Sequence, residues 1–219
     1  MLVSGKVIGF NGEVLTVVPD RPIDRELLQK SVETVEIRLN DGRSISNEQR
    51  RKIFALVEDI ALWSGHEPEF LRQLMTWRFV GKKGLEPFSL SDVDMSTAKD
   101  FITELVEFCF RHGVPTKDTL LHQTDDIGKY LYHCLEYRKC AICNAKADVH
   151  HVDPVGMGAN RQKICHVGML AIALCRSHHQ EAHIREKELF TKNHVYGIKL
   201  DRYLCDRLAL GTGGKDNKQ

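Results

Sequence analysis

Hydrophobic residues recur at helical spacing in the middle of the chain. After Ser46 they occupy positions 53, 54, 57, 60 and 61, which lie on one face of an α-helix. Ser46 suits the N-cap, and Gln49, three residues later, can complete a capping box with it. Gly65 follows the last of these hydrophobic positions. The pattern therefore predicts a helix from Ser46 to about Ser64.

Three later stretches also predict helices. Residues 67–80 predict a second helix, and residues 97–111 predict a third, which ends at Gly113 and Pro115. The apolar stripe of the third helix consists of Ile102, Leu105, Val106 and Cys109. Residues 116–137 have the pattern of a connector, with one more helix over residues 127–137. The middle of the chain is thus predicted to be helical.

The first part of the chain has a β pattern instead. Residues 2–10 and 13–19 flank Asn11 and Gly12, a pair that favours the tight turn of a hairpin. Residues 31–39 alternate between hydrophobic and polar side chains and end at the turn signal Asn40-Asp41-Gly42. We therefore expect a β element ahead of the helices.

The composition is typical of a soluble globular protein. The chain has 219 residues, of which 42% are hydrophobic and 28% charged, and this length suits one or two domains. No apolar run approaches the ~20 residues that cross a bilayer. The N-terminal residues also lack the apolar centre of a signal peptide. We therefore expect a cytoplasmic protein with no membrane partner.

The charge is distributed unevenly along the chain. Residues 138–219 contain 14 Lys and Arg against 8 Asp and Glu, whereas residues 1–137 contain 17 against 22. A basic C-terminal part fits a polyanionic partner such as DNA. The alternative is a basic face that is only solvated.

Cysteine and histidine are concentrated between residues 140 and 183. Cys140 and Cys143 form a CxxC pair, and Cys175 and His178 repeat the same two-residue gap. Without an export signal, such pairs favour a metal site over disulfides. The two pairs together offer the four ligands of a tetrahedral structural Zn²⁺ site. The alternative is unrelated reduced thiols beside a surface histidine.

The same region has more histidines than one structural site needs. His150 and His151 are adjacent, and His179 and His183 are four residues apart in a stretch of helical composition. On a helix, residues with this spacing share a face and can bind one ion together. His150, His179 and His183 are therefore predicted to hold a second metal. His151 is left as a base that can take a proton from water.

Four segments together resemble the HNH, or ββα-metal, nuclease family, in a branch found in phage and prophage nucleases. They are CAIC at 140–143, DVHHVDP at 148–154, GMGANR at 156–161 and LCRSHHQEAH at 174–183. The resemblance implies a strand with the double histidine, a loop, a second strand near residues 168–174, and a helix with the last ligands. It also implies that His150 is a metal ligand and His151 the general base.

One family feature has no clear counterpart. The middle Asn of the family orients the general-base histidine, but no Asn lies between His166 and His178. Asn160 is the candidate for this catalytic role, and His166 or Asp153 are alternatives. Three basic residues are candidates for phosphate contacts or, alternatively, solvated surface charges: Arg161, Lys163 and Arg176.

The N-terminal part has a second, less specific resemblance. Residues 32–115 are similar to the phage NinB/Orf family of recombination mediators, through the segment from Ser46 to Arg51 at the head of a helix. That resemblance implies single-stranded DNA binding, a homodimer, and recombination or single-strand-binding proteins of the host as partners. The alternative is that these residues only cap and solvate the helix.

The predicted fold is α+β, with an N-terminal β element and helical domain followed by a small zinc-supported ββα-metal domain. The predicted boundaries are 1–115 for the β-plus-helical domain, 116–137 for a helical connector, 138–210 for the nuclease domain, and 211–219 for a disordered tail.

The predicted function is metal-dependent endonuclease cleavage of DNA, in phage recombination or replication. Single-stranded, branched and duplex DNA all stay open as substrates. Mg²⁺, Mn²⁺, Ni²⁺ or Zn²⁺ is expected as the catalytic cation, beside the structural Zn²⁺. The alternative function is a non-catalytic, zinc-containing mediator that binds single-stranded DNA.

Overall fold

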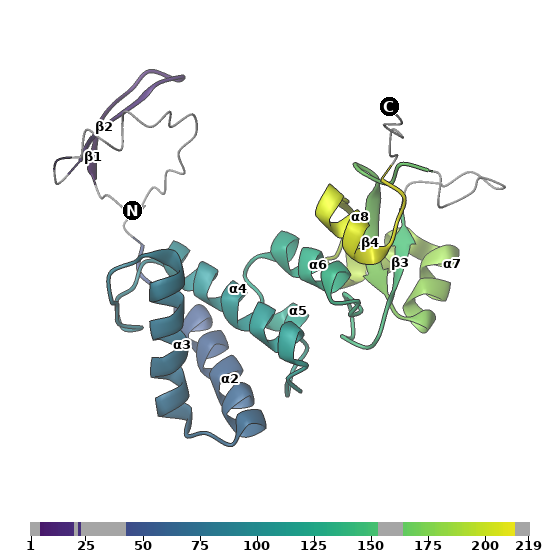
Figure 1. Cartoon of the computed structure of the whole chain (residues 1–219), viewed down its shortest axis with the longest axis horizontal. Coiled ribbons are helices and arrows are strands. Elements are labelled where there is room, and N and C mark those ends of the chain that lie inside the picture. Colours follow the sequence, from purple (N-terminus) through teal and green to yellow (C-terminus); the bar gives the residue numbers. More distant parts are fainter. Residues whose placement is uncertain (1–4, 20–21, 23–42, 153–163, 213–219) are drawn as a thin grey trace, which may run out of the picture.

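The computed structural model describes residues 5–19, 22, 43–152 and 164–212. Within these ranges the chain first forms a small β element, then a group of helices, and then a second part that combines a sheet with helices (Figure 1). The α+β class predicted from the sequence describes this mixture. The β pattern of residues 31–39 and the predicted tail beyond Thr212 lie outside the described residues.

The predicted hairpin is present at the start of the chain. Strands β1 (Gly5–Phe10) and β2 (Leu15–Pro19) pair in antiparallel register. Asn11 shapes the turn, because its side-chain oxygen accepts hydrogen bonds from the next backbone amides at 3.1 and 2.8 Å. Gly12 has φ of +99°, a conformation that favours glycine. The Asn-Gly signal therefore identified the turn correctly.

Helix α2 (Asn47–Ser64) begins and ends as its sequence predicts. The side-chain oxygen of Ser46 accepts a hydrogen bond from the backbone amide of Gln49, and the Gln49 side chain accepts one from the amide of Ser46. Gly65 ends the helix with φ of 72°. The capping box is thus confirmed.

The next two predicted helices are also present, and both extend beyond the predicted bounds. Helix α3 runs over Pro68–Lys83 and helix α4 over Met95–His112. Helix α4 starts early because the Asp94 side chain accepts a hydrogen bond from the amide of Thr97 at 2.9 Å, which is an N-cap contact. Gly113 ends α4 in the left-handed conformation, as predicted.

Helices α2, α3 and α4 bury their apolar faces against one another. Burying such side chains contributes about 1.5–3 kcal/mol each to folding. The fully buried side chains of this part include Ile53, Leu56, Ile60, Phe79, Phe101, Ile102 and Leu105. The apolar positions that predicted the helices are therefore largely the ones that form this core.

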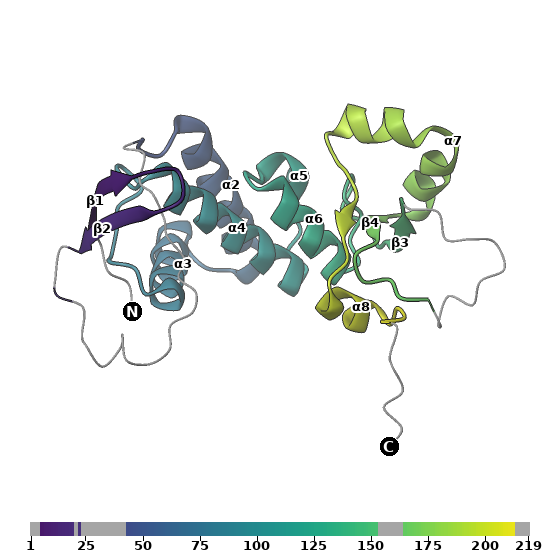
Figure 2. The same cartoon turned by 90° about the horizontal axis from the view of Figure 1, so that it is seen from above.

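A short helix and a longer one lead into the second part. These are α5 (Leu120–Gln123), which the sequence pattern did not predict, and α6 (Ile127–Glu136), which it did. Helix α6 contacts α4 of the helical group and β4 of the second part, so it lies between these two parts of the chain (Figure 2). The hydroxyl of Tyr130 on α6 donates a hydrogen bond of 3.0 Å to the carbonyl oxygen of Ala141.

The second part contains a three-stranded antiparallel sheet. Its strands, in the order β3-β4-β5, are β3 (Asp148–His151), β4 (Leu170–Leu174) and β5 (Ile198–Lys199). His150 on β3 lies opposite Ile172 on β4. The double-histidine strand and the second strand expected from the HNH resemblance are both present and pair with each other.

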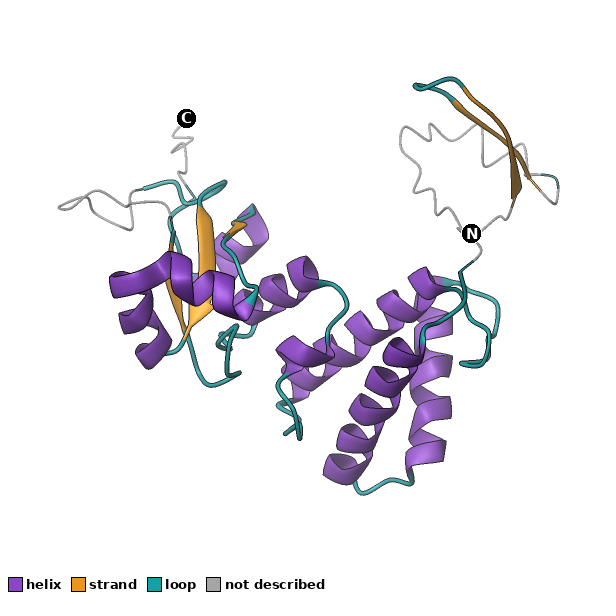
Figure 3. Cartoon of the chain, turned by 180° about the vertical axis from the view of Figure 1, so that it is seen from behind, coloured by secondary structure: helices purple, strands orange, loops and turns teal. Residues whose placement is uncertain are grey.

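Two helices complete this part. Helix α7 (Arg176–Asn193) contacts β3 and β4, and helix α8 (Arg202–Leu208) contacts α6 (Figure 3). The sheet lies between α6 and α7 (Figures 1 and 2). Helix α7 bends at Arg185, where φ is −146° and ψ is 55°. Across the described residues, no helix has the length and apolar character needed to span a membrane.

Candidate metal centres and active site

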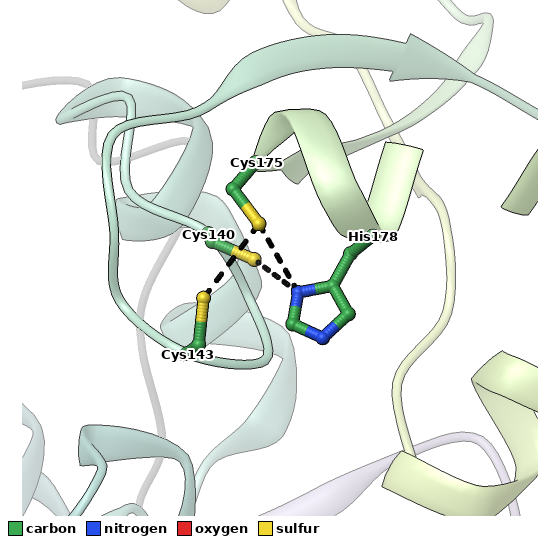
Figure 4. Close-up of side chains that lie close together, drawn as sticks. All are labelled: Cys140, Cys143, Cys175 and His178. Carbon is green, nitrogen blue, oxygen red and sulfur yellow. Dashed lines mark hydrogen bonds between the residues drawn. The ribbon is translucent and has the colours of Figure 1, made fainter. Parts of the chain in front are cut away.

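Three thiols and one imidazole converge at the start of α7. Their ligand atoms all lie within 4.8 Å of one another (Figure 4). The distance from Cys143 Sγ to Cys175 Sγ is 3.7 Å, and His178 Nδ1 lies 3.4 Å from Cys140 Sγ and 3.2 Å from Cys175 Sγ. In a tetrahedral Zn²⁺ site with ordinary bond lengths, sulfurs lie about 3.8 Å apart and a sulfur and a nitrogen about 3.6 Å apart. The four residues therefore have a spacing that fits a Zn²⁺ ion.

The backbone holds the first two cysteines in a tight turn. The Cys140 amide donates to the carbonyl oxygen of Ala145 at 2.7 Å, and the Asn144 amide donates to the carbonyl oxygen of Cys140 at 2.9 Å. Asn144 has φ of 58°, in the left-handed region that Asn tolerates. The Ala141 amide donates to the carbonyl oxygen of Ala173 on β4 at 2.9 Å. The turn with the CxxC pair is therefore fixed directly to the sheet.

The cysteines of this group differ in how readily they ionise. Burial alone raises the pKa of Cys175, but hydrogen bonds from the Ser177 hydroxyl, the His178 amide and the other two thiols lower it to about 6. Burial, followed by the nearby Cys140, raises the pKa of Cys143 to about 12. The thiolate is the form that binds metal. Of these two thiols, Cys175 therefore ionises at the lower pH and is the first to offer the thiolate that binds a metal ion.

Three histidines form a second group. His150 comes from β3, and His179 and His183 come from successive turns of α7. Their ligand atoms also lie within 4.8 Å of one another. The ring centroid of His150 is 4.8 Å from that of His179 and 5.3 Å from that of His183. His178 and His179, although adjacent in sequence, thus belong to different groups of candidate ligands.

The surroundings of His150 fit a bound cation. Its side chain is buried, and its Nε2 lies 2.8 Å from Oε2 of Glu186. Its Nδ1 is buried and has no hydrogen-bond partner among the described residues. A buried nitrogen left without a partner costs about 1–3 kcal/mol. A divalent cation held together with His179 and His183 would give this nitrogen a partner.

The other two histidines are suited to the same ion. Burial, followed by the charges of His150 and His183, lowers the pKa of His179. A lower pKa favours the neutral imidazole, which is the form that coordinates metals. His183 is exposed. The group therefore combines one buried histidine with one that is open to solvent.

His151 contacts a residue that is not a member of the three-histidine group. Its Nε2 lies 2.9 Å from Nδ1 of His166, which is completely buried. Neighbouring side chains alternate in direction along a strand, and His151 is accordingly not one of the grouped ligand residues that include His150. His166 was one of the alternatives for the missing family Asn, and the structure brings it into contact with the predicted base.

Three of the predicted site residues lie outside the described residues. They are Asn160, Arg161 and Lys163, together with the alternative Asp153. The third predicted phosphate-contact residue, Arg176, is the exposed first residue of α7. Its positive charge contributes to the lowered pKa of His179. Arg176 therefore lies close enough to the three-histidine group to influence it electrostatically.

Glu186 is a residue of this site that the sequence did not identify. It follows His183 by three residues and His179 by seven, a spacing that puts all three on one face of a regular helix. Helix α7 bends at Arg185, just before Glu186, and the Glu186 carboxylate still reaches His150. The helical spacing was a usable signal, but nothing local in the sequence indicated which partner Glu186 contacts.

The chain is similar to one known protein family. The model of HNHc_6, described as "Putative HNHc nuclease", matches residues 18–211. The match spans both groups of cysteine and histidine residues as well as the helices before them. The chain has no match among curated proteins or among solved structures.

Proposed function

Because the chain belongs to the HNHc_6 nuclease family, we propose that it is a metal-dependent endonuclease that hydrolyses phosphodiester bonds in DNA. The observation that carries this proposal is the buried Nδ1 of His150, which has no partner among the described residues. The His150 ring that carries it lies 4.8 and 5.3 Å from the rings of His179 and His183, measured between centroids. Residues 138–210 contain two groups of candidate metal ligands with different ligand types. This difference supports a structural role for one group and a catalytic role for the other.

The group of Cys140, Cys143, Cys175 and His178 is proposed to hold a structural Zn²⁺ ion. Four protein ligands close the coordination sphere, which is typical of structural rather than catalytic zinc. The ion would join the CxxC turn to the first turn of α7, and so fix the helix that carries His179 and His183. Structural zinc of this kind contributes directly to the free energy of folding.

The group of His150, His179 and His183 is proposed to hold the catalytic cation. Three neutral ligands leave most of the positive charge of the ion in place and leave positions open for phosphate and water. When bound, a divalent cation supplies electrostatic stabilisation to the scissile phosphate and to the leaving 3′ oxygen. Imidazole ligands accept several first-row ions, so Mg²⁺, Mn²⁺, Ni²⁺ and Zn²⁺ are all candidates.

His151 is proposed to be the general base. In the neutral imidazole one ring nitrogen carries the proton and the other can accept one. If His151 donates its Nε2–H to Nδ1 of His166, its own Nδ1 has the lone pair that removes a proton from the attacking water. His166 thereby takes the orienting role that an Asn has elsewhere in the family. Asn160, the sequence candidate for that role, stays a second proposal.

DNA is proposed to bind beside the exposed start of α7. Arg176 lies there, and Arg161 and Lys163 are proposed phosphate contacts on the basis of the sequence. The basic balance of residues 138–219 supports a polyanionic substrate. Contacts of this kind are made to the backbone and carry little sequence preference.

The helices before residue 138 are proposed to assist DNA binding, in a phage-type recombination or replication role. Their surface exposes aromatic side chains, among them Trp63 (45% exposed) and Trp77 (80% exposed). Exposed aromatic rings can stack on unpaired bases. This observation also favours the second candidate function, a non-catalytic mediator that binds single-stranded DNA, either as a homodimer or with recombination proteins of the host.

A cleavage panel separates the two functions. Zinc-loaded protein is incubated with single-stranded, branched and duplex DNA and with Mg²⁺, Mn²⁺, Ni²⁺ or Zn²⁺, with EDTA as the control. The nuclease proposal predicts cleavage of at least one DNA form that stops on chelation. Tight binding to single-stranded DNA, with no cleavage of any DNA form with any cation, would support the mediator function and contradict the nuclease function.

A further inference from the structure

The side chain of His150 is held between two different environments. On one edge of its ring, Nε2 lies 2.8 Å from Oε2 of Glu186. On the other edge, Nδ1 is buried and has no hydrogen-bond partner among the described residues. The His150 side chain is 4% exposed and that of Glu186 is 33% exposed. A partly exposed carboxylate therefore contacts a buried ring.

This arrangement selects one form of the imidazole. A carboxylate accepts hydrogen bonds, so the hydrogen of the His150 ring belongs on Nε2, where Glu186 can accept it. The lone pair is then on Nδ1. With its hydrogen on Nδ1 instead, the ring would bury an N–H group with no acceptor among the described residues, and would place a lone pair against the Glu186 carboxylate. The tautomer with its hydrogen on Nε2 is the one that satisfies these contacts.

Glu186 is not itself placed as a ligand of the same ion. The ligand atoms that gather within 4.8 Å of one another belong to His150, His179 and His183, and Glu186 is not among them. Its carboxylate contacts the edge of the ring that is remote from Nδ1. A carboxylate behind a histidine ligand fixes the orientation and tautomer of the ring and increases the basicity of its other nitrogen.

We propose that Glu186 is a positioning residue that holds His150 with Nδ1 presented to the catalytic cation. The inference rests on the proposed function, because it assumes that the three histidines bind an ion. It adds the atom of His150 that would bind and the residue that selects this atom. The bend of α7 at Arg185 precedes Glu186 directly, so the helix geometry here differs from that around His179 and His183.

The chain offers a matched control on the same helix. Glu181 is also a partly buried carboxylate of α7, and it pairs with Arg185 at 2.8 Å rather than with a histidine. Glu181→Ala therefore removes one negative charge from α7 without changing the partner of His150. Glu186→Gln keeps an acceptor for Nε2 and removes only the charge.

The first test is calorimetric titration of Ni²⁺ into the zinc-loaded full chain, prepared without a histidine tag. Glu186→Ala is expected to weaken Ni²⁺ binding by about 10–100-fold, the usual effect of removing such a partner. Glu186→Gln is expected to have a smaller effect, and Glu181→Ala is expected to stay within about twofold of wild type, because its partner is not a ligand. Unchanged Ni²⁺ affinity in Glu186→Ala would overturn the role of Glu186 alone. A wild-type chain that binds no Ni²⁺ beyond its zinc would overturn the three-histidine cation site, and the role of Glu186 with it.

The second test reads the tautomer directly and needs no catalytic ion. Long-range proton–nitrogen NMR spectra distinguish a histidine with its hydrogen on Nε2 from one with its hydrogen on Nδ1. We expect His150 to be in the Nε2–H form in wild type and in Glu181→Ala, and to become a mixture in Glu186→Ala. A His150 that carries its hydrogen on Nδ1 in the wild-type chain would contradict the proposal.

Discussion

Nε2 of His151 lies 2.9 Å from Nδ1 of the completely buried His166. This contact joins a residue of β3 to one that precedes β4, and it fixes the ring that we propose as general base. A side chain amide can replace such a contact if its oxygen occupies the position of Nδ1, and Asn has its oxygen at the matching distance from the backbone.

His166→Asn is therefore expected to retain activity, whereas His166→Leu is expected to lose it. We expect kcat to fall by about 10–100-fold in His166→Leu, the usual effect of removing a partner that orients a functional histidine of a metal site, and to stay within about tenfold in His166→Asn. KM for DNA should change little in either variant, since His166 is buried and makes no contact with substrate. Steady-state cleavage kinetics measure both quantities.

The control for this comparison is His122→Leu, which changes an exposed histidine on α5 that pairs only with Asp118 in the described contacts. It should leave kcat unchanged. Equal activity of His166→Leu and wild type would show that His166 does not position His151.

Loss of one thiol from the zinc group should unfold the C-terminal part. Cys140 is completely buried, and its ligand atom belongs to the group that joins the CxxC turn to α7. Cys140→Ser is expected to remove about one zinc per chain and the folding free energy that comes with it. Elemental analysis and thermal unfolding measure these effects. Cys165→Ser, at an exposed cysteine outside the group, should change neither. A folded, stable and zinc-free Cys140→Ser protein would contradict the assignment.

Tyr130 connects the helical part to the zinc group. Its hydroxyl donates to the carbonyl oxygen of Ala141 at 3.0 Å and accepts from Nδ2 of Asn144 at 2.9 Å. Tyr130→Phe would remove the hydroxyl partner of the Ala141 carbonyl oxygen and of Asn144 Nδ2. This loss is expected to lower the free energy of unfolding by about 1–3 kcal/mol. Urea denaturation measures the change. Tyr203→Phe, which removes an exposed hydroxyl that contacts Glu136, is expected to cost less. Equal costs in the two variants would mean that the buried contacts do not stabilise the junction.

Arg176 should contribute to DNA binding through charge alone. Arg176→Ala is expected to weaken binding to all DNA sequences equally and to reduce the slope of log K against log salt by about one. Fluorescence anisotropy at several salt concentrations measures the slope. Arg207→Ala, at an exposed position on α8, removes the same charge and should leave the slope unchanged. Identical salt slopes for Arg176→Ala and wild type would exclude a phosphate contact at this position.

Local signals in the sequence predicted local structure well. The Asn11-Gly12 turn and the capping box of Ser46 and Gln49 each depend on residues within three positions of one another. The start of α4 was placed too late because the N-cap signal of Asp94 was not recognised in the Ser- and Asp-rich segment before it. The short helix α5 was missed because four residues are too few to establish a helical period.

The convergence of the two Cys and His groups could be expected because most of their members come in short-range pairs. Cys140 with Cys143, and His179 with His183, have spacings that allow only a few local geometries. Glu186 behind His150 and His166 beside His151 were different, because each contact spans at least 15 residues. Such contacts depend on how β3, β4 and α7 pack, and no periodicity in the sequence specifies that packing.

The most direct test of the central claim compares wild type with His151→Ala in a plasmid cleavage assay with added divalent cation. The account predicts that wild type cuts the plasmid and that cleavage stops with EDTA. In His151→Ala, the cleavage rate should fall by about 10²–10⁴-fold, the usual contribution of a general base, while the zinc content stays the same. Cleavage by His151→Ala at the wild-type rate would contradict the assignment of the base. The absence of cleavage by wild type with every cation tested would contradict the nuclease itself.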